Sequence, residues 1–263
     1  MTGSSGLVGS AVARALDAAG FVVHGLDRVP GPFTTTLGDL RERRELPFGA
    51  HVLVHAAALH APHVGRVPDA AFRAVNVDAT AALLHAADRA GARRVVFISS
   101  TSVYGHALVP VDRTVWVDET LRPQPRDIYD ETKLAAERLV AASPVSAVTL
   151  RIARCFPQPL PLQAVHLLHR AVGLPDVAAA VLQALERPVT GIFTIAGRYP
   201  FERGDDLFHD AAAVIEERAP QVAAAFRSRG WQLPQSLDRV YDSTAAGRAF
   251  GYRPEVTAMD VLR

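Results

Sequence analysis

The chain lacks three features that would place it in a specialised class of protein. It has a single cysteine, Cys155, which excludes a disulfide framework within the chain and fits a reducing compartment. Its 28 Lys+Arg balance 27 Asp+Glu without a long basic run, which argues against a nucleic-acid binder, because such proteins bind mainly by neutralising phosphates. No apolar run approaches the ~20 residues of a membrane span, and the start of the chain does not have the layout of a signal peptide. We therefore expect a cytoplasmic protein with neither nucleic acid nor membrane as a partner.

What the sequence does contain is an alternation of strands and helices in a chain of 263 residues that is 49% hydrophobic. This alternation is typical of an α/β fold, a doubly wound parallel sheet of the Rossmann type with helices on both faces. We predict a dinucleotide-binding domain over 1–155. In 156–263 we expect a mixed segment, part of which returns to the main sheet and part of which forms a small substrate lobe. The expected strands are 21–27, 34–40, 51–58, 93–100, 146–153 and 191–197, and the expected helices are 7–19, 69–90, 128–142, 176–185 and 205–218.

A glycine-rich turn at the start of the chain predicts a dinucleotide site. Gly3, Gly6 and Gly9 form G-x-x-G-x-x-G where the first helix begins, so that a pyrophosphate would meet free N–H groups and no Cβ atoms. The next strand ends in Asp27, and an acidic residue about 20 positions after such a turn binds the ribose hydroxyls of NAD. This carboxylate would repel the 2′-phosphate of NADP, although Arg28 beside it leaves NADP open. The cofactor-binding residues predicted here are Gly3, Ser5, Gly6, Leu7, Asp27 and Arg28.

No strand precedes this turn, although a doubly wound sheet places its first strand at the centre. The central position lies between the strand ending at Asp27 and the strand ending near His55, and its loss would orphan buried backbone groups at ~1–3 kcal/mol each. We expect Met1 to stand where the last apolar residue of that strand belongs, with the translation start assigned too late. If Met1 is the true start, we expect weaker cofactor binding or another segment in the gap.

A second pattern predicts proton transfer beside the dinucleotide. Tyr129 and Lys133 are four residues apart and so share one helical face, while Ser100 ends the buried strand 93–100. A tyrosine with its ordinary pKa of ~10 is a poor base, but a nearby ammonium group and the positive nicotinamide ring would lower that pKa. Ser100 would hydrogen-bond the same substrate oxygen. We predict Ser100, Tyr129 and Lys133 as the catalytic residues of a hydride-transfer enzyme.

Together these motifs resemble the short-chain dehydrogenase/reductase superfamily, in its extended branch of NAD-dependent epimerases, dehydratases and sugar dehydrogenases. The glycine spacing indicates this branch, and so do "GDL" (38–40), "HAAA" (55–58), "NVDAT" (76–80), "SVYG" (102–105), "YDETKLAAE" (129–137) and "FGYRP" (250–254). The resemblance implies a homodimer through helices 69–90 and 128–142. It also implies cofactor contacts: Asp39 and Leu40 flank the adenine, Ala56 and Ala57 line the middle of the cofactor, Asn76 lies beside the cofactor at the helix start, and Lys133 holds the nicotinamide ribose.

Two acidic residues depart from the pattern of that branch. Asp130 and Glu131 follow Tyr129, where family members usually carry small or neutral residues. Both carboxylates would raise the pKa of the tyrosine if they pointed inward. We expect them to face solvent, since they lie on other faces of the helix.

The substrate region departs as well. After "LRIARC" (150–155), residues 156–177 are too few for the excursion with which nucleotide-sugar enzymes of this branch hold a diphosphate. This short passage resembles the uronate dehydrogenase-like members and favours a small substrate. Thr101 and Ser102 stand where the 4,6-dehydratases carry an Asp-Glu pair, which argues against a dehydratase.

The ten histidines do not predict a metal site. His55, His60 and His63 are close in sequence, and His166 and His169 are three apart, but no carboxylate completes a recognisable ligand set. Cys155 is expected to be a packed residue without an activating base. The guanidinium groups of Arg154 and Arg170 suit a carboxylate or phosphate, and the alternative is that they form surface ion pairs. For His60 and His63, the alternative is that they are loop residues without a ligand. The substrate-binding residues predicted are His60, Thr101, Arg154 and Arg170.

These observations favour an NAD-dependent oxidoreductase that acts on a sugar or a sugar-derived alcohol or carbonyl. A nucleotide-sugar epimerase of the C4 type with retained NAD would use the same residues, and the sequence does not separate the two. The third hypothesis is an inactive dinucleotide-binding relative or regulator, which the missing strand favours and the Tyr/Lys/Ser set disfavours.

Overall fold

A parallel sheet forms the centre of the molecule in a computed structural model that describes residues 1–42, 50–110 and 112–263. Four strands pair in parallel in the order β3 (Val52–His55), β4 (Arg94–Ser100), β6 (Ala147–Ile152) and β7 (Gly191–Ile195). β1 (Gly25–Asp27) and β2 (Thr34–Leu37) form a further parallel pair. Thr2 bridges both Leu26 of β1 and His55 of β3 and so joins the two parts. The predicted α/β fold with a parallel sheet is confirmed.

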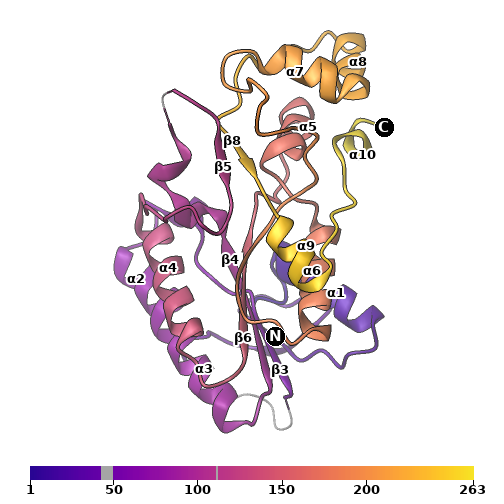
Figure 1. Cartoon of the computed structure of the whole chain (residues 1–263). Coiled ribbons are helices and arrows are strands. Elements are labelled where there is room, and N and C mark those ends of the chain that lie inside the picture. Colours follow the sequence, from indigo (N-terminus) through magenta and orange to yellow (C-terminus); the bar gives the residue numbers. More distant parts are fainter. Residues whose placement is uncertain (43–49, 111) are drawn as a thin grey trace.

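Helices cover both faces of this sheet (Figure 1). One face carries α1 (Leu7–Ala18), α6 (Leu174–Glu186) and α9 (Thr244–Phe250), and the other carries α2 (Asp69–Arg73), α3 (Ala79–Arg89) and α4 (Ile128–Ala141). With helices on both sides, six of the seven residues of β4 are buried, which explains its continuous apolar run. None of the helices in the described ranges is long and apolar enough to cross a membrane.

The predicted helix 69–90 is interrupted by a π-helical turn. The turn η2 (Ala74–Asp78) links α2 to α3 without a break in the helical path. Single π-turns inside α-helices are rare and occur often at functional sites, because they re-aim the side chains they carry. Here the turn carries Asn76, which is buried.

A small lobe stands beyond one end of the sheet (Figure 1). It has its own apolar core, in which Phe201, Leu207, Ile215 and Phe226 are buried. The sequence predicted a helix from 205, but α7 begins only at Ala211, and the passage 156–177 contains a helix that was not predicted. The elements of the lobe are β5 (Val115–Val117), α5 (Leu160–His169), α7 (Ala211–Arg218), α8 (Pro220–Ser228), β8 (Arg239–Tyr241) and α10 (Ala258–Leu262).

Residues 1–3 occupy the centre of the sheet, where the sequence placed the end of a first strand. The amide of Leu26 donates to the carbonyl of Met1 (2.8 Å), and the amide of Thr2 donates to the carbonyl of Val54 (3.0 Å). The predicted strand 21–27 forms only from Gly25 onward, and the side chain of Val22 is 84% exposed. A strand continues only where its neighbours offer a ladder of hydrogen bonds, and the pairing of β1 with Met1–Gly3 reaches only its last residues.

Candidate active site

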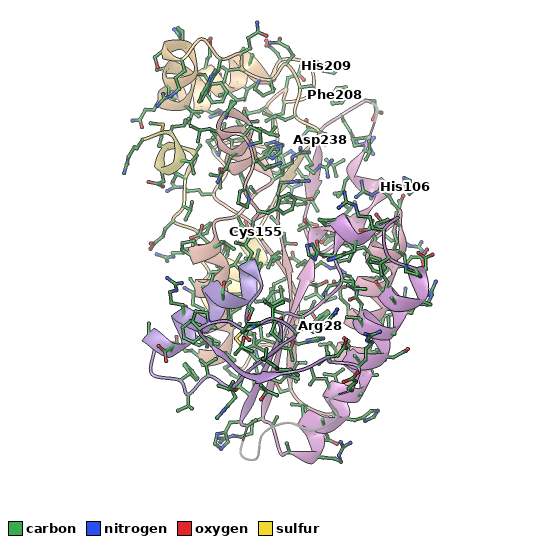
Figure 2. The ribbon with its side chains drawn as sticks, turned by 180° about the vertical axis from the view of Figure 1, so that it is seen from behind. Arg28, His106, Cys155, Phe208, His209 and Asp238 are labelled. Carbon is green, nitrogen blue, oxygen red and sulfur yellow. The ribbon has the colours of Figure 1, made fainter. Side chains whose placement is uncertain are left out.

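A cavity of about 930 Å³ opens at the carboxyl ends of the parallel strands, which is where ligands bind in open α/β sheets. It runs from the glycine turn to the lobe, and Figure 2 shows Arg28, Cys155 and Asp238 at successive levels along this length. Every predicted cofactor, catalytic and substrate residue except Asn76 lines it. These residues are Gly3, Ser5, Gly6, Leu7, Asp27, Arg28, Asp39, Leu40, Ala56, Ala57, His60, Ser100, Thr101, Tyr129, Lys133, Arg154 and Arg170.

The glycine turn has the geometry of a phosphate-binding loop. Gly3 has a φ of +73°, and a Cβ there would lie 2.7 Å from the backbone nitrogen of Ala57. A Cβ on Gly9 would lie 1.8 Å from the carbonyl oxygen of Gly3, whereas one on Gly6 would meet only that same oxygen at 3.4 Å. The absence of Cβ atoms at Gly3 and Gly9 therefore allows the turn to close. At Gly6, the backbone at the start of α1 is open towards the cavity. The residues present fit the pyrophosphate of a dinucleotide, which would meet the N-terminal amides of α1.

Asp27 stands at the end of β1 with its carboxylate held in place. Its Oδ2 accepts from the amide of Ser5 (2.9 Å) and its Oδ1 from the amide of Val29 (3.0 Å). Arg28 turns instead to Asp39 (3.7 Å), which also binds Arg41 at 2.7 Å. The hydrogen bond from Arg41 holds the pKa of Asp39 at about 2. The fixed carboxylate of Asp27 fits the ribose hydroxyls of NAD better than the 2′-phosphate of NADP.

Asn76 was predicted to lie beside the cofactor, but its side chain faces into the protein. Its Oδ1 accepts from the amide of Leu59 (2.8 Å), and its Nδ2 donates to the carbonyl of Leu59 (2.9 Å) and to the hydroxyl of Thr132 (3.0 Å). In its place Val75 lines the cavity. The amide of Asn76 thus fixes the loop after β3 against α4.

The buried His55 links the glycine turn to Asn76 through hydrogen bonds with two threonines. Nδ1 of His55 lies 2.6 Å from the hydroxyl of Thr2, and Nε2 lies 2.9 Å from the hydroxyl of Thr80. Thr80 donates its proton to the carbonyl of Asn76 (2.8 Å), so Nε2 of His55 donates to Thr80 and Nδ1 accepts from Thr2. Burial first, and then the charge of Lys133, lower the pKa of His55 to about 3. His55 is therefore neutral, and sequence reasoning missed its partners because each is a single threonine in a different segment.

Tyr129 and Ser100 line the same cavity. Burial raises the pKa of Tyr129 to about 12; a hydrogen bond with Ser100 opposes this rise, and the carboxylate of Asp130 adds to it. Desolvation of the phenolate thus dominates the pKa of Tyr129, and its lowering by Lys133 together with the positive nicotinamide ring stays a prediction. At neutral pH Tyr129 is a phenol that can donate a proton.

Lys133, the only lysine of the chain, is buried one helical turn after Tyr129. Its Nζ donates to the carbonyl of Ile98 (2.7 Å) and lies 4.0 Å from the centre of the Phe97 ring. Burial lowers the pKa of Lys133 to about 7, and Glu137 partly opposes this. The protein thus holds an ammonium group that is ready to lose its proton near neutral pH.

Asp130 corrects the expectation that both acids after Tyr129 face solvent. It is buried, accepts a hydrogen bond from the hydroxyl of Ser102, and pairs with Nε of Arg126 at 3.4 Å. The reason is that the helix face one residue on from Tyr129 meets the 3₁₀ turn η3 (Thr101–Tyr104). Only Glu131 is exposed, where it pairs with Arg73 at 3.5 Å.

The lobe end of the cavity, where the sequence predicts substrate binding and which we name the substrate end, is lined by side chains from the lobe and its connections. Arg154 stacks on the Phe156 ring (4.5 Å), and Arg170 pairs with Asp238 (3.3 Å). Burial raises the pKa of Cys155 to about 11, which agrees with a packed thiol. Sequence reasoning missed Phe156, Arg239 and Tyr241, which also line the cavity; no motif marks them.

The other histidines do not gather into a metal site. The amide of His60 donates to Nδ1 of His63 (3.1 Å) at the cavity wall. His166 contacts Gln158 (2.5 Å), and His169 donates to the carbonyl of Arg239 (2.7 Å). Across the residues the structure describes, no group of three or more His, Cys, Asp or Glu side chains could hold a metal ion.

Two curated proteins resemble part of the chain in sequence. Over about half of the chain, it is 34% identical to a 3-beta-hydroxysteroid dehydrogenase of Mycolicibacterium neoaurum (155 residues, 53% of this chain and 41% of that protein). It is 31% identical to a UDP-glucose 4-epimerase of Streptomyces lividans (156 residues, 53% and 45%). The chain thus matches less than half the length of these curated relatives.

Solved structures share the fold over the whole chain. A short-chain dehydrogenase/reductase superfamily protein from Agrobacterium tumefaciens with bound NAD superposes with a TM-score of 0.73 at 22% identity, covering 99% of this chain and 93% of that one. A UDP-glucuronic acid 4-epimerase from Bacillus cereus, in complex with UDP-glucuronic acid and NAD, gives 0.71 at 22% identity, covering 99% and 95%. At this identity the likeness concerns the fold.

The family itself comes from residues 1–157, which match the model of the NAD dependent epimerase/dehydratase family. This match spans the glycine turn, Asp27 and the Tyr129/Lys133 helix, and it confirms the resemblance predicted from those motifs. The family description also names NAD, the cofactor that Asp27 favours. The chain therefore belongs to the NAD-dependent epimerase/dehydratase family.

Proposed function

We propose that the protein is an NAD-dependent oxidoreductase that acts on a sugar or a sugar-derived alcohol or carbonyl. The observation that carries this proposal is that Ser100, Tyr129 and Lys133 line one cavity, with Ser100 as a hydrogen-bonding partner of Tyr129. When bound, NAD supplies the hydride acceptor or donor. The residues of the chain supply the proton and hold the reacting oxygen.

Each of the three residues has one role in this proposal. Tyr129 donates its phenol proton to a carbonyl oxygen in reduction. In oxidation it receives the hydroxyl proton as the phenolate, the form that the charge of Lys133 and the positive nicotinamide ring would favour. Ser100 hydrogen-bonds the same substrate oxygen and orients it towards Tyr129. Lys133 binds the ribose hydroxyls, and its positive charge stabilises the phenolate that remains after proton donation.

A polar substrate fits the far end of the cavity better than a steroid does. Arg154, Arg170 and Arg239 line that end, and an apolar ring system there would leave guanidinium groups desolvated without partners. The match to the steroid dehydrogenase covers 53% of this chain and 41% of that protein. We therefore place sugars ahead of steroids as the substrate class.

The epimerase remains the second candidate, because a UDP-glucose 4-epimerase is among the relatives and the same three residues serve both reactions. Epimerisation returns the hydride to the other face of the keto intermediate, so it consumes no added NAD. A homodimer and a cytoplasmic location stay predictions from the sequence.

The test is an absorbance assay for NADH with purified protein, NAD and a panel of neutral sugars, uronic acids, UDP-sugars and a 3β-hydroxysteroid. NADH formed in proportion to a sugar supports the dehydrogenase. Conversion of a UDP-sugar without added NAD would reject the dehydrogenase in favour of the epimerase. NADH formed only from the steroid would reject sugars as the substrate class. A fluorescence titration with NADH addresses the inactive relative: no binding at millimolar NADH would defeat every enzymatic proposal.

A further inference from the structure

Three arginines from separate segments gather at the lobe end of the cavity. Arg154 follows β6, Arg170 follows α5, and Arg239 begins β8. All three line the same cavity. Their charges act on one another, since Arg239 and Arg154 both contribute to a lowered pKa of Arg170. We name these residues the arginine cluster.

One carboxylate stands against these three cations. Asp238 pairs with Arg170 (3.3 Å) and, more closely, with Arg239. Arg154 rests its guanidinium on the Phe156 ring. His166 adds no counter-charge, because burial lowers its pKa to about 4. The cluster thus holds an excess of positive charge in a partly buried place, which is costly unless an anion joins it.

Two hydrogen-bond donors of the cluster are also unused. Among the described residues, Nε of Arg170 and Nε of Arg239 are buried without a hydrogen-bond partner. The side chains of these arginines are 25% and 12% exposed. Buried donors without partners are rare in folded proteins, and each needs an explanation such as a ligand.

The cluster lies close to the reacting centre. Cys155, next to Arg154 in the chain, is near enough to Tyr129 for a thiolate there to raise the pKa of the phenol. Tyr129, Cys155, Phe156 and the arginine cluster all line this one cavity. A single small molecule can therefore contact Tyr129 at one end and the arginines at the other.

We propose that the arginine cluster binds an oxyanion carried by the substrate itself, a carboxylate or a phosphate ester on a monosaccharide, while the reacting carbon lies at Tyr129. The inference rests on the proposed function for the position of the reacting carbon. It goes beyond it in naming an acidic monosaccharide as the substrate class and Arg239 as a residue that selects it. Planar guanidinium forks suit both oxyanions.

The first experiment measures binding with NADH present, by calorimetric titration of glucuronate, glucose 6-phosphate, glucose and UDP-glucose. We expect one of the two acidic sugars to bind at least about tenfold more tightly than glucose, which identifies the carboxylate or the phosphate ester as the anion. Arg154→Gln and Arg239→Gln should each weaken that binding by about tenfold or more, while NADH affinity stays the same. The control is Arg187→Gln, an exposed residue outside the cavity, which changes the charge equally and should have no effect.

Three results would overturn the inference: glucose bound as tightly as the acidic sugars, variants that bind them as tightly as the natural chain does, or UDP-glucose bound more tightly than either. Circular dichroism checks that each variant is folded. Arg170 is left unchanged because its guanidinium group also contacts the buried His166 (2.6 Å).

A second measurement needs no cofactor and so separates this inference from the proposed function. Inorganic phosphate should raise the melting temperature of the natural chain and of Arg187→Gln more than that of the Arg154→Gln, Arg239→Gln double variant. Equal shifts of the melting temperature in all three proteins would refute the oxyanion site even if NADH binds. Failure of NADH to bind would refute the proposed function. The phosphate-dependent melting temperatures would still test the arginine cluster as an oxyanion site.

Discussion

The two ends of the cavity are built in opposite ways. At the cofactor end, the contacts come from backbone and small side chains in short contiguous segments, such as the turn Gly3–Gly9 and the paired Ala56 and Ala57. At the substrate end, long charged side chains reach in from segments up to 85 residues apart, Arg154 to Arg239. The cofactor end is thus fixed by local conformation, and the substrate end by the way the lobe folds back on the sheet.

This difference predicts where substitutions act. A change at the junction of the two ends should stop the reaction, a change in the glycine turn should act through the backbone, and a change of charge should act through selectivity.

The largest effect is expected at the junction. Tyr129→Phe removes the proton that passes to or from the substrate, and we expect kcat to fall by ~10²–10⁴-fold. The affinity for NADH should stay the same, because the ring that lines the cavity remains. Steady-state kinetics and a NADH fluorescence titration measure the two quantities. Tyr199→Phe, which removes the hydroxyl of a tyrosine in the lobe packed against Trp116, is the matched control, and a Tyr129→Phe variant with full activity would refute the assigned role.

A backbone effect comes next. Gly9→Ala would place a Cβ 1.8 Å from the carbonyl oxygen of Gly3, so the turn has to open, at a cost of ~1–3 kcal/mol. We expect a lower melting temperature and a loss of NADH affinity of about tenfold or more. Gly204→Ala, where a Cβ meets nothing within 4 Å, should change neither. If Gly9→Ala binds NADH normally, cofactor binding does not depend on the closed backbone of this turn.

A smaller effect is expected where charge selects the cofactor. Asp27→Asn removes the negative charge at the ribose and keeps one of the two oxygens that accept from the amides of Ser5 and Val29, so one of these amides loses its acceptor. NADH affinity should fall by about tenfold, since hydrogen bonds to a charged group are worth ~1.5–3 kcal/mol. NADPH affinity should rise relative to it, because the repulsion of the 2′-phosphate is gone. An unchanged ratio of the two affinities would mean that Asp27 does not set the preference.

The smallest effect concerns the proton of Lys133. As the only lysine of the chain, it gives one signal in a protein labelled with ¹³C-lysine, and that signal should titrate near pH 7. The folded pKa lies below the unfolded value of ~10.4, so the unfolded state binds more protons between the two and stability rises with pH across this window. Urea denaturation should show this rise in the natural chain, and less of it in Lys133→Met. Titration of the signal near its unfolded value would contradict the buried position of the ammonium group.

The cofactor end could be read from the sequence, because its residues are consecutive and their chemistry is tied to glycine, aspartate and a helix start. The same holds for Tyr129 and Lys133, whose spacing alone places them on one face of α4. The order of the sheet followed too: Thr2 does lie between β1 and β3. The predicted strand 21–27 is longer than β1, because its apolar residues do not show how far the neighbouring segment Met1–Gly3 extends beside it.

The substrate end could not be read in this way. β5 and β8 are three residues each and pair across more than a hundred positions, so their apolar pattern is too short to detect. Arg239 enters the cavity only through this pairing. Asp130 was misjudged for a related reason: helical periodicity gives the direction of a side chain, but η3, which covers that face, comes from another segment.

The relay of hydrogen bonds from Thr2 through His55, Thr80 and Asn76 to Thr132 has a mechanical consequence. It fastens the phosphate-binding turn to the helix that carries Tyr129, so thermal displacements of the two are correlated and largely cancel in the distance between them. A misplacement of ~1 Å in a reacting pair can cost about a hundredfold in rate. The relay therefore links the glycine turn and the Tyr129 helix, the two elements whose separation the proposed reaction depends on.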